Sequence, residues 1–295
     1  MTETLEQTLI AYDAWLDRQP LAAKTRVAYR LQVHHYGEYL AQRTPTADDP
    51  LRTPFTRDYA IRDYKIYLKT ERQAKPTSVN LALAAIDHFH QFLGNDRPRI
   101  QRERLPAQAP RALKPEEQKA FLRAVEPTSS VRDKAIAHLL LYTAVRLGEC
   151  AALNLDDVRI SARKGIVIIR SGKGDTYREV PLNAEVREAL RTWLKERNKR
   201  FPQTREPALF LNASGNRLSA RAIDLIIRRI GADARLDLSA HVLRHTCLTS
   251  LVRRGNDLVL VAEIAGHKRL ETTRRYSLPS REDREAAMEE LWVDY

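Results

Sequence analysis

Apolar residues recur at helical spacing through the first hundred residues of the chain. The repeat is clearest near the N-terminus, at Leu5, Leu9, Tyr12 and Leu16. Residues three or four positions apart lie on one face of a helix, so the repeat predicts a helix with a buried face. Similar repeats predict helices over 25–39, 57–68 and 77–93, with a turn-rich stretch over 43–54. Residues 1–96 therefore predict a four-helix bundle.

The helical pattern breaks after this bundle. Residues 95–114 contain three prolines and six basic side chains but only two acidic ones, with few apolar positions. This composition predicts an extended linker, which we assign to residues 97–112. A linker that crosses a phosphate backbone has this composition, and so does any solvated linker.

Residues 113–295 predict a second, mainly helical domain. Its first helix opens at Lys114-Pro115-Glu116-Glu117, where a proline and acidic residues suit a helix N-terminus. A long apolar helix follows over 132–145, and helices resume near Glu185.

One clear β signal lies inside this second domain. The runs 165–170 and 177–182 are rich in β-branched residues and flank the turn Ser171-Gly-Lys-Gly-Asp175. Two such runs around a glycine-rich turn predict a β-hairpin. The predicted fold class is therefore mainly α, with a helical bundle followed by an α-rich domain that carries a small β element.

Charge narrows the classes of partner. The net charge is +12, of which residues 1–100 carry about +2 and residues 101–295 about +10. A basic excess of this kind favours a polyanionic partner, most often nucleic acid, although a solubilising surface gives the same count.

Other sequence features predict a cytoplasmic protein. No apolar run approaches the roughly 18–20 residues that span a bilayer, and the acidic, amphipathic N-terminus differs from a signal peptide. Cys150 and Cys247 lie far apart in apolar helical patterns, so we expect buried thiols rather than a disulfide or a metal pair.

Nucleic-acid cleavage by side chains alone needs a specific set of groups. A nucleophile attacks phosphorus, cationic donors hold the non-bridging oxygens, and an acid protonates the leaving oxygen. Arginine suits the second role because its fork donates two parallel hydrogen bonds and keeps its proton.

The first candidates lie near the apolar helix and at the hairpin. Arg146 follows that helix, Gly148 marks a break after it, and Glu149 stands three residues on from Arg146, where it can orient the guanidinium. Lys173 lies between two glycines at the hairpin tip, which allows close approach to a ligand. Taken alone, such an arginine is usually a surface charge and such a lysine an exposed turn residue.

The remaining candidates lie toward the C-terminus. His241 and Arg244 share one face of a helix that follows the N-cap residue Ser239, and another face of the same helix is apolar. His267 follows a glycine that ends the helix over 258–265, and Tyr276 comes nine residues later beside two arginines. A structural role is the commoner explanation for each of these residues alone.

In this order, these residues resemble the tyrosine recombinase (phage integrase) family. The resemblance covers nearly all of residues 111–279 and is weaker over the bundle and linker. The further matching motifs are Arg132-Asp-Lys-Ala135, Ala152-Leu-Asn-Leu-Asp-Asp-Val158, Ala265-Gly-His267 and Thr272-Thr-Arg-Arg-Tyr276. The departures are Ala144, Val145 and Ala265, where the family more often has glycine, leucine and leucine.

The resemblance implies a site-specific recombinase of the compact Xer-like or transposon and plasmid resolvase-like kind. Residues 1–96 would be a core-binding domain and 113–295 the catalytic domain, the two forming a C-shaped clamp on double-stranded DNA. Tyr276 would attack a phosphodiester and form a 3′-phosphotyrosine. The implied catalytic set is Arg146, Lys173, His241, Arg244, His267 and Tyr276. No cofactor, metal or nucleotide is implied.

The resemblance also implies a tetramer that joins two duplexes through a four-way junction, either of one chain or with a related recombinase. Residues 281–295 carry a net charge of about −4 and include Met288, Leu291 and Trp292. Ser280 and Asp283 resemble a capping box that opens a helix there. This acidic helix is expected to dock on protein, either on its own domain or on a neighbouring subunit.

Two other functions fit the sequence less well. A type IB topoisomerase uses related chemistry, but the bundle, linker and size favour a recombinase. A DNA-binding regulator that kept the fold and lost strand exchange would not need the full catalytic set. The biological role among integration, resolution and chromosome dimer resolution stays open.

Overall fold

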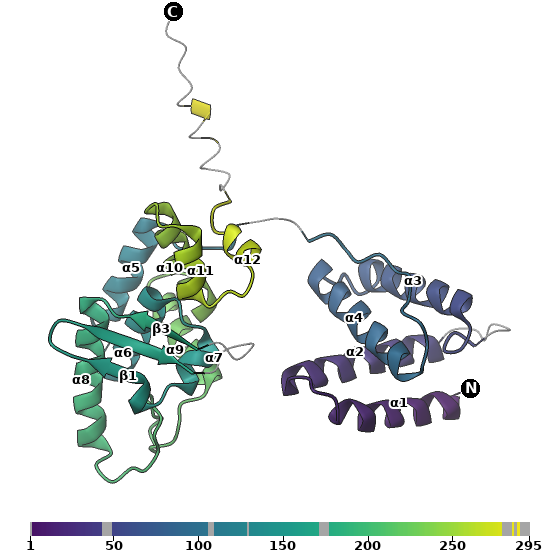
Figure 1. Cartoon of the computed structure of the whole chain (residues 1–295), viewed down its shortest axis with the longest axis horizontal. Coiled ribbons are helices and arrows are strands. Elements are labelled where there is room, and N and C mark those ends of the chain that lie inside the picture. The colour runs from purple at the N-terminus through teal and green to yellow at the C-terminus, as the bar shows by residue number, and fades with distance from the viewer. Residues whose placement is uncertain are drawn as a thin grey trace, which may run out of the picture. The chain divides into compact units, whose positions relative to one another are not determined.

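The structure is a computed structural model that describes residues 2–42, 49–105, 109–128, 130–170, 177–278, 285 and 288–289. The chain folds into two compact units, residues 1–106 and 107–295. Figure 1 shows the first as a group of helices and the second as helices around a small sheet.

The first unit is a four-helix bundle, which confirms the prediction. Its helices are α1 (Thr2–Asp17), α2 (Ala23–Ala41), α3 (Pro54–Thr70) and α4 (Pro76–Phe92). The last two begin earlier than predicted, because Pro54 and Pro76 occupy the first helical turn, where the missing amide donor costs nothing. Tyr12, Val33 and Phe89 pack together with no exposed surface or almost none.

Residues 95–105 have no regular secondary structure and lie along α3 and α4. Arg97 and Arg102 both pair with Asp87 on α4, and Glu103 pairs with Lys65 on α3. This part of the predicted linker is therefore held against the bundle by ion pairs.

Besides a small apolar cluster that includes Tyr276, the second unit has one large apolar core, on which its helices are built. Its longer helices are α5 (Pro115–Val125), α6 (Val131–Thr143), α8 (Ala184–Arg200), α9 (Ala220–Asp233) and α10 (Ala240–Arg253). The shorter ones are α7 (Leu147–Ala152), the 3-10 turn η1 (Leu155–Asp157), α11 (Leu258–Ala265) and α12 (Leu270–Arg274). Phe121, Leu140 and Ile227 are fully buried in this core, and α6 packs against α8 and α10.

The end of α6 corrects one prediction. The helix stops at Thr143, and Ala144 adopts a left-handed conformation (φ 52°), so the chain turns there and not at Gly148. Gly148 lies inside α7, and Arg146 stands just before that helix. The left-handed residue ends α6 although it is not glycine, and it is buried in the same apolar cluster as Tyr276.

A small antiparallel sheet packs against these helices. It consists of β1 (Val158–Ile160), β2 (Gly165–Ile169) and β3 (Arg178–Pro181), in that order. The predicted pairing of the two hairpin strands is confirmed, with Val167 opposite Val180. The predicted turn, including Lys173, lies outside the described residues. The strand β1 was not predicted, because a segment of three residues is too short to show an alternating pattern.

The start of α10 corrects a second prediction. Ser239 stands at the N-cap position, but its side chain caps nothing. The amide of Ala240 instead donates to the carboxylate of Asp224 on α9, at 3.0 Å. A carboxylate from a neighbouring helix thus fixes the start of the helix that carries Arg244.

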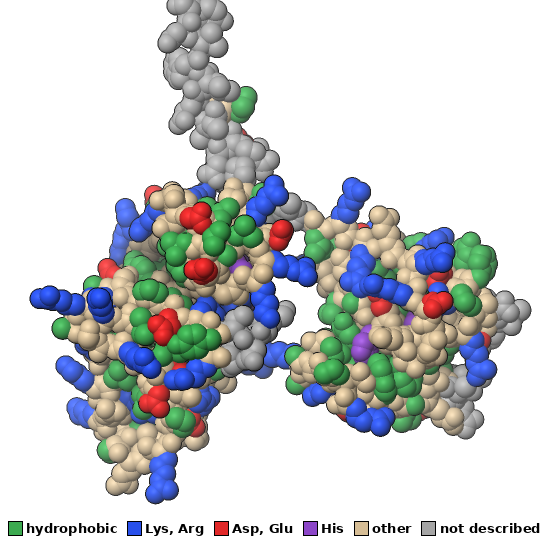
Figure 2. Space-filling view, in the orientation of Figure 1, with side chains coloured by type: hydrophobic (Ala, Val, Ile, Leu, Met, Phe, Trp, Pro, Cys, Tyr) green, Lys and Arg blue, Asp and Glu red, His purple; other side chains and the backbone are tan. Residues whose placement is uncertain are grey.

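The two cysteines are in the state that the sequence predicted. Cys150 and Cys247 are buried free thiols. None of the helices in the described part of the chain is long and apolar enough to cross a membrane. Lys and Arg side chains are scattered over the face of each unit that Figure 2 shows.

A close contact at Gly231 sets the path from α9 into α10. A Cβ there would lie 2.7 Å from the Cβ of Leu238 and 3.0 Å from the carbonyl oxygen of Leu236. We expect Gly231→Ala to destabilise the protein by about 1–2 kcal/mol, because overlap outweighs the gain in helix propensity. Urea unfolding measures this difference. Gly148→Ala is the control, since a Cβ there meets nothing within 4 Å, and equal stability of the two variants contradicts the prediction.

Candidate active site

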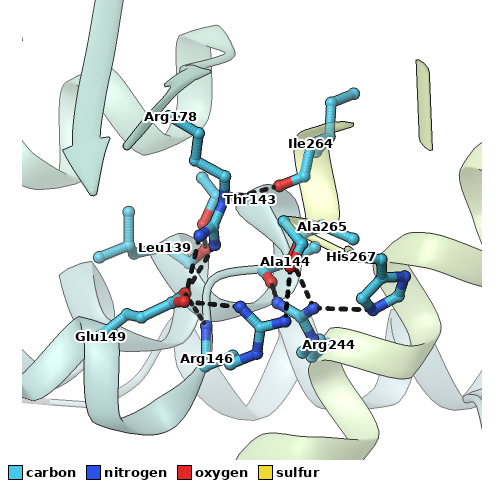
Figure 3. A network of polar contacts seen from close by, with 11 residues as sticks. Leu139, Thr143, Ala144, Arg146, Glu149, Arg178, Arg244, Ile264, Ala265 and His267 are labelled. Atoms are coloured by element: carbon cyan, nitrogen blue, oxygen red, sulfur yellow. Dashed lines mark hydrogen bonds and ion pairs between the residues drawn. The ribbon is translucent and has the colours of Figure 1, made fainter. Parts of the chain in front are cut away.

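Arg146 is held by the residue that the sequence assigned to orient it. Its side chain donates from Nη1 to Glu149 at 2.7 Å, and its backbone amide donates to the same carboxylate at 2.7 Å. The second terminal nitrogen, Nη2, donates to the carbonyl oxygen of Gly266 at 2.9 Å. Arg146 therefore links the start of α7 to the end of α11, which Figure 3 shows.

A second arginine holds the other side of Glu149. Arg178 on β3 donates to both carboxylate oxygens, at 3.1 and 2.6 Å, and its Nε donates to the carbonyl oxygen of Ile264 at 3.0 Å. Burial alone would raise the pKa of Glu149. The hydrogen bonds from Arg178 and from the amide of Arg146 outweigh burial and lower that pKa to about 2. Glu149 is therefore an anion at neutral pH.

Arg244 is buried among backbone carbonyls. It is 4% exposed and donates to the carbonyl oxygens of Ala144 and, at 2.7 Å, of Ala265. Burial and the neighbouring charge of Arg146 lower its pKa to about 10, which leaves it charged at neutral pH. The sequence placed Arg244 on an outward face with His241, but the carbonyls that end α6 and α11 enclose it.

His267 is fixed by contacts on both ring nitrogens. It follows Gly266, whose left-handed conformation (φ 63°) ends α11 as predicted. Nε2 lies 3.2 Å from Arg244, and Nδ1 lies 2.8 Å from the hydroxyl of Thr273. Burial and the charge of Arg244 lower the pKa of His267 to about 4, so the ring is neutral. Because arginine only donates, Nε2 is the acceptor and Nδ1 carries the proton.

Tyr276 lies beside these groups. It is 6% exposed, and its ring lies parallel to that of His267 with centroids 6.0 Å apart. Its hydroxyl oxygen lies 2.9 Å from Nδ1 of His245. Burial raises the pKa of Tyr276, while the charges of Arg244 and Arg275 oppose that shift.

The structure brings four of the six predicted residues together: Arg146, Arg244, His267 and Tyr276. His241 is exposed at the start of α10 and meets this group through His245, whose ring lies nearly parallel to its own at 5.9 Å. The position of Lys173 lies outside the described residues.

Two residues of the site were missed by the sequence analysis. Arg178 lies on the same strand face as Val180, so strand alternation placed an arginine on the core side. His245 stands four residues after His241, and that spacing puts both rings on one helical face. Both signals were present in the sequence, but neither residue type is unusual enough to be noticed without its contacts.

The arrangement is suited to holding an anion next to a hydroxyl nucleophile. Arg146 and Arg244 place two positive charges close together, and no carboxylate in the described part of the chain pairs with Arg244. Glu149 acts on Arg244 only through space, and a buried guanidinium without a carboxylate in contact is costly, which favours a ligand that supplies the charge. Among the same residues no group of His, Cys, Asp and Glu side chains is arranged to hold a metal ion.

Comparison with known proteins identifies the class. The phage integrase family model matches residues 111–282, which is more than half of the chain. The chain belongs to this family and is a tyrosine recombinase.

Within the class the chain is similar to Xer proteins. It is 30% identical over 276 residues to the tyrosine recombinase XerD of Vibrio cholerae, covering 89% of this chain and 88% of that protein. Its fold matches the crystal structure of XerH bound to its difH substrate with a TM-score of 0.71 at 22% identity, over 91% of this chain and 79% of that one. A lambda integrase dimer bound to a COC′ core site matches with a TM-score of 0.68 at 15% identity, over 98% of each chain.

The contacts of Arg178 predict that this residue affects strand cleavage through Glu149 and Arg146. We expect Arg178→Met to slow strand cleavage by about 10–100-fold, because Glu149 loses its bidentate partner and Arg146 loses its fixed position. Single-turnover cleavage of a nicked duplex at saturating protein measures this rate.

The matched control is Arg197→Met. Arg197 on α8 is 3% exposed and binds the carbonyl oxygens of Glu206 and Ala208, away from the site. This variant is expected to lose stability but to cleave at the wild-type rate when folded. Equal cleavage rates in the two variants contradict a positioning role for Arg178.

Proposed function

We propose that this recombinase cleaves DNA by attack of Tyr276 on a phosphodiester and exchanges strands between two sites. The observation that carries the proposal is the buried Arg244 guanidinium, held by carbonyl oxygens beside Arg146 and His267, with the hydroxyl of Tyr276 next to it. A phosphate diester supplies the negative charge that this cluster lacks.

The chemistry follows from the positions of these groups. The Tyr276 oxygen bonds to phosphorus as the bond to the 5′ oxygen breaks, which leaves a 3′-phosphotyrosine and a free 5′ hydroxyl. Arg146 and Arg244 hold the non-bridging oxygens, whose charge grows in the transition state. Lys173 protonates the leaving oxygen, while His241 and His267 support proton transfer and contact the phosphate oxygens.

The covalent intermediate conserves the energy of the cleaved bond. A 5′ hydroxyl from the partner strand attacks the phosphotyrosine, which re-forms a phosphodiester and releases Tyr276. The proposed cycle therefore consumes no nucleotide cofactor.

The proposal assigns a role to each part of the chain. Residues 1–96 act as a core-binding domain and 97–112 as the linker, while residues 113–295 carry the chemistry. The basic excess supports double-stranded DNA as the partner. A cytoplasmic location belongs to the same proposal.

We expect Tyr276→Phe to abolish covalent attachment to DNA, because phenylalanine has no hydroxyl to attack phosphorus. The assay uses nicked duplexes from DNA that flanks the gene and detects a protein–DNA adduct that survives denaturation. Wild-type protein should form the adduct, and the variant should bind DNA equally well without forming it. An adduct with the variant contradicts the proposal, and binding without any adduct by wild type favours a DNA-binding regulator.

A groove on the second unit supports assembly through the C-terminal segment. The groove has a volume of about 760 Å³ and lies between β3 and α11. Its large exposed apolar side chains are Tyr177, Val259, Leu260 and Leu270. The proposed occupant is segment 281–295 of a neighbouring subunit in a tetramer, because that segment offers apolar side chains on an acidic background. The position of most of this segment lies outside the described residues.

The groove also shares residues with the active site. Its lining includes Gly266 and His267, which accept hydrogen bonds from Arg146 and Arg244, and Arg178, which binds Glu149. A segment docked there contacts residues that position the phosphate clamp.

We expect deletion of residues 281–295 and Leu260→Glu to cause the same defect. Each variant should bind a single DNA site but fail to pair two sites, because one lacks the docking segment and the other repels it with a buried charge. Gel-shift analysis of two-site complexes measures pairing.

Mixing the two variants distinguishes exchange from docking within one chain. The deletion variant keeps an intact groove and Leu260→Glu keeps an intact segment, so a mixture should recover one subunit contact. Normal pairing by the deletion variant, or no recovery in the mixture, contradicts exchange.

A further inference from the structure

The proposed mechanism leaves one proton without a named acceptor. When the Tyr276 oxygen bonds to phosphorus, its phenolic proton must leave. The ring of His267 lies parallel to that of Tyr276, at an interplanar angle of 5° and with the centroids 6.0 Å apart. Both of its nitrogens are already engaged, by Arg244 and by Thr273. His267 is therefore poorly placed to take this proton.

His245 has the geometry that His267 lacks. Its Nδ1 lies 2.9 Å from the hydroxyl oxygen of Tyr276, and the two rings are tilted by 43° with centroids 5.6 Å apart. Within the described part of the chain no other histidine nitrogen contacts this hydroxyl. A distance of this size is a hydrogen bond, and a candidate base must lie within such reach of the proton that it removes.

The charge state of His245 suits an acceptor. Burial, with the nearby charge of Arg275, lowers its pKa to about 4, so the ring is neutral at physiological pH. A neutral ring that carries its proton on Nε2 leaves Nδ1 free to accept from the phenol. A phosphate bound against Arg244 adds negative charge close by and raises the pKa of His245 again, which favours transfer in the DNA complex.

We propose that His245 accepts the proton of Tyr276 as its hydroxyl attacks the phosphodiester. The bond from the tyrosine oxygen to phosphorus forms, the bond from phosphorus to the 5′ oxygen breaks, and the phenolic proton passes to Nδ1 of His245. The 5′ oxygen receives its own proton from the separate acid. In rejoining, the imidazolium returns the proton to the departing tyrosine oxygen. This inference rests on the proposed function of Tyr276.

The test compares two substitutions of His245 in single-turnover cleavage of a nicked duplex. His245→Ala removes the ring, whereas His245→Asn keeps a hydrogen-bond acceptor that cannot take a proton. Both variants should cleave about 100-fold more slowly than wild type, in line with the usual effect of losing a general base. A wild-type rate in His245→Asn overturns the inference, because it assigns His245 to orientation alone.

A modified nucleophile and a modified leaving group separate this role from a loss of structure. A fluorinated tyrosine at position 276 has a more acidic phenol and should recover at least about tenfold of the loss in His245→Ala. A 5′-bridging phosphorothiolate, whose leaving sulfur needs no protonation, should recover none of it. The inference fails if the fluorinated tyrosine has no effect or if the phosphorothiolate restores cleavage.

Two controls distinguish a specific role of His245 from other causes of slow cleavage. His138→Ala removes a partly buried imidazole on α6, away from the site, and should leave cleavage unchanged. Wild type and Tyr276→Phe report on the proposed function itself. If wild type forms no adduct, the proposed function fails; if it does and His245→Ala equals it, only the assignment of His245 fails.

Discussion

The site depends on the hydrogen bonds that the buried carboxylate of Glu149 accepts. It accepts hydrogen bonds from the side chain and amide of Arg146 and from both terminal nitrogens of Arg178. One anion thereby joins α7 to β3, and both arginines also bind carbonyls near the end of α11. Without this anion, the positive charges of Arg146 and Arg178 would repel each other in a partly buried space. The position of α7, β3 and the end of α11 therefore depends on the charge of Glu149.

The site concentrates positive charge where the fold offers little to neutralise it. Arg244 is enclosed by the ends of α6 and α11, and its partners in the described part of the chain are uncharged: two carbonyl oxygens, the imidazole of His267 and the hydroxyl of Tyr276. Packing alone does not require a charge there, since an apolar side chain fills such a space at less cost. In the proposed mechanism the cluster is an anion site whose donors are already held in place by the fold, and such an arrangement lowers a barrier without reorganisation during the reaction.

Much of this was predictable from the sequence, for physical reasons that differ between elements. The helices of the bundle were predicted because burial of one face imposes a period on the sequence, and Gly266 was recognised because a left-handed helix end favours glycine. The end of α6 was placed wrongly because Ala144 adopts that same conformation without being glycine. The cap of α10 was assigned to Ser239 because the competing group, Asp224, comes from another helix.

The candidate site shows the same division. Arg146, Arg244, His267 and Tyr276 were singled out by their residue types and order, and Glu149 by its position near Arg146. Arg178 and His245 were missed because their importance lies in contacts across 29 and 31 positions of sequence. Spacing within one helix or strand predicts neighbours on that element, but it carries no information about which strand meets which helix.

The most direct test of the central claim uses DNA in which a methylphosphonate replaces the cleaved phosphate. The methyl group removes the negative charge that Arg146 and Arg244 are proposed to hold. On natural DNA, Arg146→Ala and Arg244→Ala should each slow cleavage by about 100-fold or more. On the methylphosphonate, each variant should approach the wild-type rate on that same substrate. An equal loss on both substrates would contradict the account, because the arginines would then serve the fold and not the phosphate.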